Sequence, residues 1–307
     1  MRFLKRFALA AVVLGGNGAQ SDTVVVAPFS TGFYLLPAAG GSKLYGPTGP
    51  GATWFNAQWN SPADYANYKP FKCPAARTEC YTARSPNERA EAYTVGGVQH
   101  IVLGERGSNI ACGTELDNLL APVNSARFPG YPAAVVSRPN LGALAKLNVK
   151  FTVAPLFDGY AEGVATCSSA LTKGSVFFAL TLSCPPKQGS CGVSGQTLFY
   201  ELFIRLFNQP AFSPAFFANS NPFGFHDALD QFPRCGSWPR TGFQYSVPST
   251  FSCDVLPRLK KIISTASNGL DRVLKDWNVG SAYMGNVLYG HVRVESDWSD
   301  VSVYSVP

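Results

Sequence analysis

The chain has 307 residues, of which 46% are hydrophobic and only 14% charged, and its formal net charge is +6 at pH 7. Arg2, Lys5 and Arg6 supply three of these charges, so the rest of the chain carries a surplus of only +3. So small a surplus, without a basic cluster, argues against a nucleic-acid partner. Frequent Gly, Pro and Phe favour many strands joined by turns instead.

The first twenty residues have the layout of a secretory signal peptide. Three cations precede the apolar run 7–14, and small and polar residues follow it at 15–21. The apolar run is too short to span a bilayer. We therefore expect cleavage near residue 20, a secreted or periplasmic protein, and no membrane insertion after signal removal. A buried N-terminal strand is the alternative for this segment.

The cysteine count supports an exported protein. An even number of cysteines in such a chain predicts disulfides, and the absence of a C-x-x-C pair argues against a zinc or redox site. We expect no metal and no cofactor. Two local pairs, Cys73/Cys80 and Cys184/Cys191, should each close a short loop, and the other four cysteines leave three pairings open: Cys112, Cys167, Cys235 and Cys253.

Strand patterns dominate the chain from its beginning. Apolar or alternating runs at 23–27, 33–36 and 149–153 predict strands, and a Gly-Gly pair at 96–97 predicts a two-residue hairpin turn between 89–95 and 98–104. Long apolar runs at 176–184 and 197–207 predict an antiparallel pair in the middle of a sheet. Two more alternating runs follow, at 287–295 and 301–306.

Helix patterns are few. Asp254, Pro257 and the apolar positions 256, 259, 262 and 263 predict one helix, and a second short helix could cover 114–121 with Thr114 as its cap. No linker or repeat divides the chain. We expect residues 21–307 to form a single disulfide-stapled domain, an all-β, antiparallel jelly-roll-type sandwich with one or two short helices.

The predicted hairpin gathers chemically useful side chains. A two-residue turn at 96–97 pairs Tyr93 with His100, and alternation then puts Arg89 and Glu91 on the same face. An Arg can neutralise a sugar carboxylate while Tyr and His move a proton, so Arg89, Tyr93 and His100 are catalytic candidates and Glu91 a substrate-binding one. A solvated face with one Arg–Glu pair explains the pattern as well.

The run 197–207 offers a second candidate site. Alternation places Glu201 and Arg205 on one side, among phenylalanines at 199, 203 and 207. That arrangement fits a cleft floor, with Glu201 catalytic and Arg205 binding substrate. It fits a central strand whose two charges satisfy each other equally well.

Further substrate contacts are predicted from aromatic and charged side chains. Trp54, Trp59 and Trp238 are candidates for stacking on sugar rings, although burial in the core is the alternative for aromatics. His291 lies in the run 287–295 among charged neighbours, where a cleft and a solvated face both explain the pattern.

A pair of acidic residues comes closest to a glycosidase motif. Glu115 and Asp117, in the sequence CGTELD, would share one face if the segment were a strand, as a pair of catalytic carboxylates requires. The capped helix over 114–121 is the alternative.

The C-terminal segment LKDWNVGSAYMGNVLYGHVRVESDWSDVSVYSVP resembles the closing strands of concanavalin A-like jelly-roll lectins and polysaccharide-degrading enzymes. The resemblance covers about the last tenth of the chain and implies a concave, glycan-binding sheet. The Arg, Tyr and His of the hairpin are also similar to the set used by jelly-roll polysaccharide lyases, but the Tyr-rich C-terminal motif of those enzymes is absent.

Together these patterns indicate a secreted protein whose partner is a polysaccharide or other glycan. A lyase or glycoside hydrolase would gather acids, Arg, Tyr and His in one cleft, whereas a lectin would show exposed aromatics without an acid/base pair. A non-catalytic lectin-like or structural exported protein is the alternative, and the sequence leaves open whether the chain is an enzyme.

Overall fold

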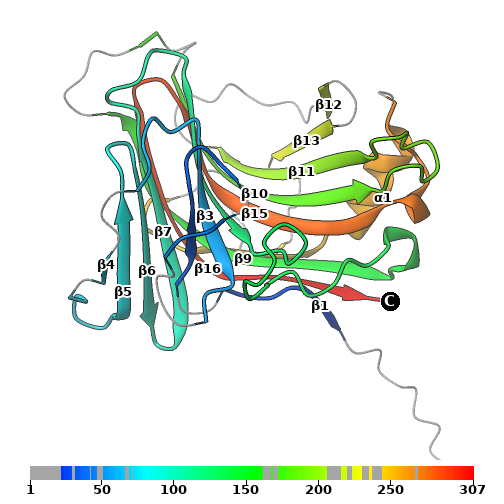
Figure 1. Cartoon of the computed structure of the whole chain (residues 1–307), viewed down its shortest axis with the longest axis horizontal. Coiled ribbons are helices and arrows are strands. Elements are labelled where there is room, and N and C mark those ends of the chain that lie inside the picture. Colours follow the sequence, from blue (N-terminus) through cyan, green and yellow to red (C-terminus); the bar gives the residue numbers. More distant parts are fainter. Residues whose placement is uncertain are drawn as a thin grey trace, which may run out of the picture.

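Two curved sheets packed face to face make up the computed structural model of the protein (Figure 1). It describes residues 22–307 except 30–31, 42, 47–50, 66–68, 71, 162–166, 169–171, 206–215, 220–222, 230–234, 237–243 and 267–268. The predicted signal peptide at 1–20 therefore lies outside the described residues.

The first sheet, sheet A, has β16 at its centre. β16 pairs antiparallel with both β9 and β7, and β1 pairs antiparallel with the C-terminal end of β16, beyond its pairing with β7. In spatial order the strands are β14 (Ser249–Asp254), β9 (Lys146–Tyr160), β16 (Val292–Val306), β7 (Val98–Arg106), β6 (Glu88–Val95), β5 (Thr78–Arg84) and β4 (Lys69–Pro70), with β1 (Thr23–Val26) on β16.

The second sheet, sheet B, carries the long apolar runs in its middle. Its neighbours are antiparallel except for β11 with β13 and β2 with β3, which are parallel. In spatial order the strands are β12 (Phe216–Asn219), β13 (Phe223–Leu229), β11 (Gln196–Arg205), β10 (Lys173–Cys184), β15 (Asn278–Tyr289), β8 (Glu115–Pro122), β3 (Trp54–Trp59) and β2 (Tyr34–Leu36).

The main hydrophobic core lies between the sheets. Phe178 of β10 stacks on Phe151 of β9 at 4.7 Å between ring centroids, and Phe151 in turn packs on Phe251 and Trp298. All four rings are at most 1% exposed. These rings join the two sheets, and the burial of such large side chains is the main stabilising contribution of the core.

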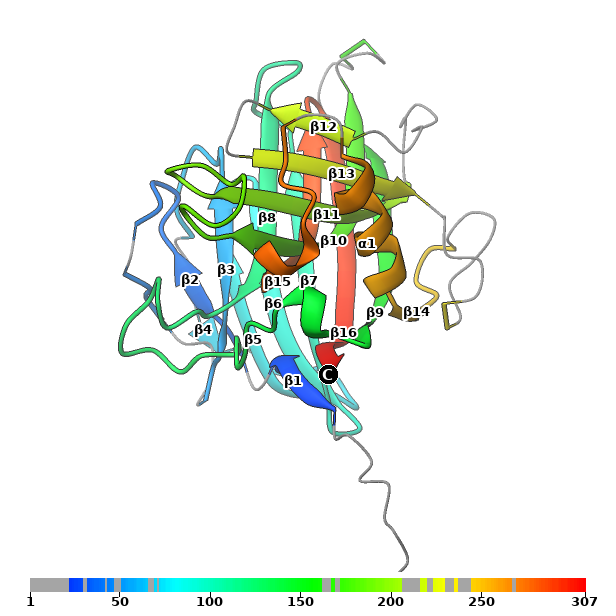
Figure 2. The same ribbon diagram turned by 90° about the vertical axis from the view of Figure 1, so that its right-hand side faces the viewer.

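Helical structure is short and lies at one end of the sandwich (Figure 2). Helix α1 (Leu256–Thr265) begins where Asp254 Oδ1 accepts a hydrogen bond from the Leu256 N–H, with a proline in its first turn as predicted. Its apolar side chains at 256, 259, 262 and 263 join the main core. Two single turns, η1 (Leu141–Ala143) and η3 (Leu274–Asp276), complete the helical content of the described residues.

The predicted fold class, an all-β jelly-roll-type sandwich, is confirmed, and so is the register of the hairpin. Val95 pairs with Val98 and Tyr93 with His100, across glycines 96 and 97 that both have positive φ. The long runs form the antiparallel pair β10–β11 as predicted. Residues 206 and 207 of the second run lie outside the described residues.

Two sequence predictions were wrong. The short helix expected over 114–121 is strand β8, because neighbouring strands β15 and β3 pair with it on both sides and override its local helix signals. The single strand expected over 287–295 is split, because Gly290 adopts a φ of +68° and turns the chain from β15 into β16.

All eight cysteines form disulfides, as the even count predicted. Both local pairs are confirmed, and Cys184–Cys191 closes the connection between β10 and β11. The remaining bonds join Cys112 to Cys167 and Cys235 to Cys253. Among the described residues, no helix combines the length and apolarity needed to cross a membrane.

Candidate functional site

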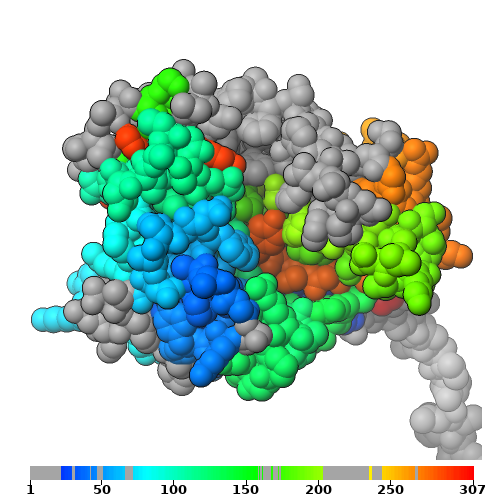
Figure 3. Space-filling view, turned by 45° about the horizontal axis from the view of Figure 1, so that its top comes forward, coloured from blue at the N-terminus to red at the C-terminus, as the bar shows by residue number. Residues whose placement is uncertain are grey.

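The face of sheet B that points away from the core is hollowed into a groove of about 500 Å³. Figure 3 shows the hollow between the blue β2–β3 segment and the light-green connection after β10, with the orange of β15 on its floor. Five strands and the segment after β8 line it: Phe55 and Trp59 (β3); Glu115, Asp117, Leu119, Ala121 and Pro122 (β8); Asn124, Arg127 and Phe128; Phe177 and Thr181 (β10); Phe199 and Glu201 (β11); Ser281, Ala282 and Tyr283 (β15).

Strand alternation explains why these side chains reach the groove. In β11, Leu198, Tyr200 and Leu202 point into the core, so Phe199 and Glu201 point outward. The same alternation in β8 sends Leu116 inward and Asp117 outward. Alternate residues of the long apolar runs therefore lie in the core and in the groove.

Glu115 and Asp117 form a carboxyl pair on β8. Burial raises the pKa of Asp117 to about 8, and the charge of Glu115 and a hydrogen bond with Glu115 add to the effect. Asn60 Nδ2 donates a hydrogen bond of 3.4 Å to Asp117 Oδ2, which lowers the pKa of Asp117 only slightly. The raised pKa favours the protonated form of Asp117 at neutral pH, beside a second carboxyl group.

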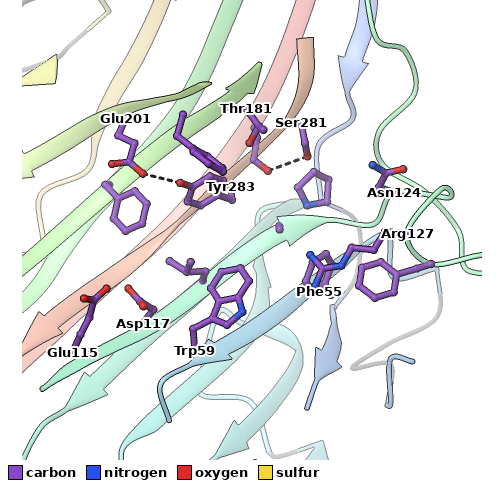
Figure 4. Close-up of a pocket in the computed structure, with 17 residues that line it drawn as sticks. Phe55, Trp59, Glu115, Asp117, Asn124, Arg127, Thr181, Glu201, Ser281 and Tyr283 are labelled. Atoms are coloured by element: carbon purple, nitrogen blue, oxygen red, sulfur yellow. Dashed lines mark hydrogen bonds between the residues drawn. The ribbon is translucent and has the colours of Figure 1, made fainter. Parts of the chain in front are cut away.

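Glu201 lies across the groove from this pair, as Figure 4 shows. Its Oε1 accepts a hydrogen bond of 2.7 Å from the Tyr283 hydroxyl, and Glu201 is 8% exposed. The Tyr283 ring packs edge-on against Phe177 and Phe199, at 5.7 and 6.0 Å between centroids. Neighbouring strands thus fix both the tyrosine and the carboxylate that it contacts.

Tyr289 interacts electrostatically with the Glu115–Asp117 pair and with Glu201. Its pKa is raised by burial, by a hydrogen bond to Glu115, and by the charges of Glu115, Asp117 and Glu201. Since one phenol responds to all three carboxyl groups, they belong to one electrostatic site, although they come from strands β8 and β11.

The opposite wall of the groove is aromatic and cationic. The Arg127 guanidinium lies 5.0 Å from the Phe128 ring centroid and 5.8 Å from that of Phe55, and burial lowers its pKa. Asn124 lies near Arg127, whereas Trp59 lies beside Asp117, its cross-strand partner on β8 (Figure 4). Flat rings beside amide and guanidinium groups can contact both the faces and the hydroxyl groups of a sugar.

The hairpin candidates Arg89, Glu91, Tyr93 and His100 do share one face, as predicted. Arg89 and Glu91 approach to 3.5 Å, and the Tyr93 and His100 rings stack at 4.9 Å. Asp297 of β16 accepts from the Tyr93 hydroxyl and lies 3.1 Å from His100 Nδ1.

These four residues and Glu201 lie on opposite outer faces of the sandwich and do not share a groove. Ala90 and Ala92 of β6 belong to the core, so Arg89, Glu91 and Tyr93 point outward from sheet A. Glu201 points outward from sheet B, on the other side of the sandwich. The structure therefore holds two separate candidate faces.

The remaining predicted residues are dispersed. Trp59 lines the groove, whereas Trp54 is fully buried and its indole N–H donates to the Ala27 carbonyl. His291 Nε2 lies 2.8 Å from the Ile110 carbonyl oxygen, beside the Cys112–Cys167 disulfide. The side chain of Arg205 and the whole of Trp238 lie outside what the structure describes.

Sequence reasoning missed Tyr283, Arg127 and the neighbours that place them. The pattern Ser281–Tyr283 in an alternating strand was the available signal for the first. Arg127 lies in an irregular segment after β8, where no periodicity marks a position as facing a groove. The Glu115–Asp117 pair was noted, but its site required the strand reading of 115–122.

No protein-family model matches the chain, and neither does any curated protein sequence. Among solved structures, the chain is similar to a family 12 xyloglucanase from Bacillus licheniformis, with a TM-score of 0.42 and 10% identity over 78% of this chain and 99% of that one. Endoglucanase 3 from Trichoderma harzianum gives 0.39 and 8%, over 80% and 96%. A family 11 xylanase from Neocallimastix patriciarum gives 0.32 and 6%, over 84% and 94%.

These three structures are an endoglucanase, a xyloglucanase and a xylanase. At such TM-scores and identities the likeness carries no conclusion about activity. The chemistry of this chain has to be argued from its own groove.

Proposed function

We propose that the groove of sheet B binds a polysaccharide chain and hydrolyses its glycosidic bonds, with Asp117 as general acid and Glu201 as general base. The observation that carries the proposal is a buried carboxyl group with a raised pKa, Asp117, in the same aromatic-lined groove as a second carboxyl group, Glu201. Glycoside hydrolysis needs this combination, because one group must protonate the leaving oxygen while the other activates water.

Glu115 has a positioning role in this scheme. Its hydrogen bond with Asp117 leaves no room for a sugar between the two groups, so the pair cannot act from opposite sides of one bond. Instead its negative charge keeps the proton on Asp117, as a catalytic acid requires at neutral pH.

The strand order argues against a retaining reaction. β10 and β15 separate β11 from β8, so three strand spacings of about 4.8 Å put the Cα atoms of Glu201 and Asp117 at least ~14 Å apart across the sheet. The registers also offset the two residues along the strands, because Asp117 pairs with Val287, which is level with Ser175 rather than with Ala179, the partner of Glu201. So wide a spacing does not suit the ~5 Å carboxyl separation of a retaining pair.

Substrate affinity would come from the aromatic, amide and guanidinium groups of the groove. Trp59 can stack on a sugar face, while Arg127 and Asn124 can bond its hydroxyl groups. The predicted export of the chain fits a substrate outside the cell.

The test is a panel of neutral and acidic polysaccharides, assayed for binding and for release of reducing ends. Asp117→Asn and Glu201→Gln should each lower the rate by about 10²–10⁴ while the chain still binds glycan. Trp59→Ala should weaken binding. If the parent protein binds glycans without releasing products, the lectin-like alternative replaces the hydrolase.

A lyase reaction on sheet A is the second candidate. The contact of His100 with Asp297 favours it, because such a carboxylate orients an imidazole for proton transfer. Arg89→Ala and His100→Ala, assayed for unsaturated products, separate the two faces. Loss of activity in these variants, with Asp117→Asn unaffected, would move the site to sheet A.

A further inference from the structure

One end of the groove of sheet B holds an arginine without an acidic partner, Arg127. Its guanidinium lies over the Phe128 and Phe55 rings, and among the described residues its side chain makes no ion pair and no hydrogen bond. Arg84 and Arg293, by contrast, each pair with a glutamate. Arg127 is exposed to solvent and lines the groove, so a ligand can reach it.

The two rings hold the guanidinium in place and exclude water from one side of it. Phe55 and Phe128 pack edge-on at 4.9 Å between centroids, are at most 3% exposed, and belong to a cluster of buried apolar side chains beside the groove. Contact with such fixed rings orients the charge of Arg127. The loss of water lowers the pKa of Arg127, and a bound anion would compensate for it.

Asn124 presents a hydrogen-bond donor at the same end of the groove. The chain turns here, because the Asn124 carbonyl accepts from the backbone N–H groups of Arg127 and Phe128. The side-chain Oδ1 accepts from the Ala126 N–H at 2.9 Å, so Nδ2 is the end of the amide left for the groove, and it has no partner among the described residues. Figure 4 shows Asn124 close to Arg127. Together the two side chains offer donors only.

A set of donors without acceptors fits a carboxylate better than a hydroxyl group. A hydroxyl group brings a proton that needs an acceptor of its own, whereas both oxygens of a carboxylate accept. An arginine can bind a carboxylate through two parallel N–H···O bonds, and its charge makes each bond roughly twice as strong as a neutral one. The Asn124 amide can add a third bond.

This donor pair is remote from the proposed catalytic acid. Asp117 and Ala121 are four residues apart on β8, which corresponds to about 13 Å along the strand. Ala121 pairs with Phe55, whose ring lies under Arg127. One sugar ring is too small to span that distance, so an anion held by Arg127 belongs to a different sugar unit from the one at Asp117. Its role is to select the polymer.

We propose that Arg127 and Asn124 form a subsite for the carboxylate of a uronic acid, so that the groove selects an acidic polysaccharide. The inference rests on the glycan binding proposed above for this groove. It adds a substrate class that the hydrolytic step itself does not require, and the two can therefore be tested apart.

The experiment compares three uronate polymers, polygalacturonate, alginate and glucuronoxylan, each with its own carboxyl-reduced, neutral form. Affinity electrophoresis of the full protein measures binding. At least one acidic polymer should bind about tenfold more tightly than its reduced form. Arg127→Gln should abolish this preference, whereas Arg272→Gln, which removes the same charge at an exposed position outside the groove, should keep it.

Asn124→Asp is a second variant, chosen to preserve the turn. It keeps an oxygen that accepts from the Ala126 N–H but replaces the donor with a charged acceptor, so it should also abolish the preference. Equal binding of every acidic polymer and its reduced form would overturn the subsite. So would a preference that persists in Arg127→Gln. Arg127-dependent binding of dextran sulfate as tight as that of the uronate polymers would overturn the choice of a carboxylate.

Hydrolysis is read separately, from the release of reducing ends. A preference that depends on Arg127, without released reducing ends, would refute the hydrolase and support the subsite. Release at equal rates from acidic and reduced polymers that also bind equally would support the hydrolase and overturn the subsite. Asp117→Asn should keep the binding preference in either case.

Discussion

Replacement of Asp117 by asparagine should change how stability depends on pH. The pKa of Asp117 rises from an ordinary 3.8 to about 8 in the folded protein, mainly through burial. A carboxyl group with a raised pKa contributes stability that is fully present below about pH 4 and is lost as the pH rises through 8. At about 1.4 kcal/mol per pH unit, the loss amounts to ~6 kcal/mol for the pair, because Asp117 and Glu115 titrate together.

An asparagine side chain carries no charge, so Asp117→Asn should remove most of this loss. Near pH 4 the variant should be about as stable as the parent, and near pH 9 it should be more stable by a few kcal/mol. Guanidinium unfolding, followed by tryptophan fluorescence at several pH values, measures the difference. The other buried carboxyl groups are present in both proteins, so their contributions cancel in the difference between the two unfolding free energies.

The control is Asp300→Asn, which removes an exposed carboxylate and should leave the pH dependence unchanged. Parallel curves of unfolding free energy against pH for the parent and Asp117→Asn would refute the reasoning. In that case Asp117 would be ionised at neutral pH and could not serve as the general acid.

Three further predictions concern export and stability. Intact-mass measurement of secreted material should show cleavage near residue 20 and a mass gain of eight hydrogen atoms on reduction of the four disulfides, and free thiols on most cysteines would contradict this. Removal of the Cys184–Cys191 bond by Ala at both positions should lower the unfolding free energy by roughly 2–3 kcal/mol, and peptide mapping checks the pairing. Phe178→Ala, which empties the inter-sheet aromatic stack, should cost about 3–5 kcal/mol in chemical denaturation, whereas a loss below 1 kcal/mol would mean that the stack is not tightly packed.

Local patterns predicted the parts of the fold that local physics decides. The register of the hairpin followed from two glycines, and the pairing of β10 with β11 followed from two apolar runs joined by a short disulfide loop. Segment 114–121 was misread because its capping threonine and acids favour a helix locally, while its strand partners β3 and β15 lie far away in sequence.

The candidate site was predictable only in pieces for the same reason. Glu201 and Trp59 could be picked out as cleft residues, but no sequence pattern shows that β8 and β11 lie three strands apart in one sheet. Nor does the pattern around the hairpin show which side of the sandwich Arg89 faces. Those facts depend on how the sheets are ordered, which long-range packing decides.

The central position of β16 also has a kinetic consequence. Residues 292–306 pair with β7, β9 and β1, so Thr23 lies opposite Ser305 in the finished sheet. Until that strand is present, three strands of sheet A have open edges, and contacts between residues so distant in sequence form slowly. Sheet A is therefore expected to close only after this last strand is in place. A chain exported in the unfolded state would meet this requirement, because its last strand is available before any stable intermediate has formed.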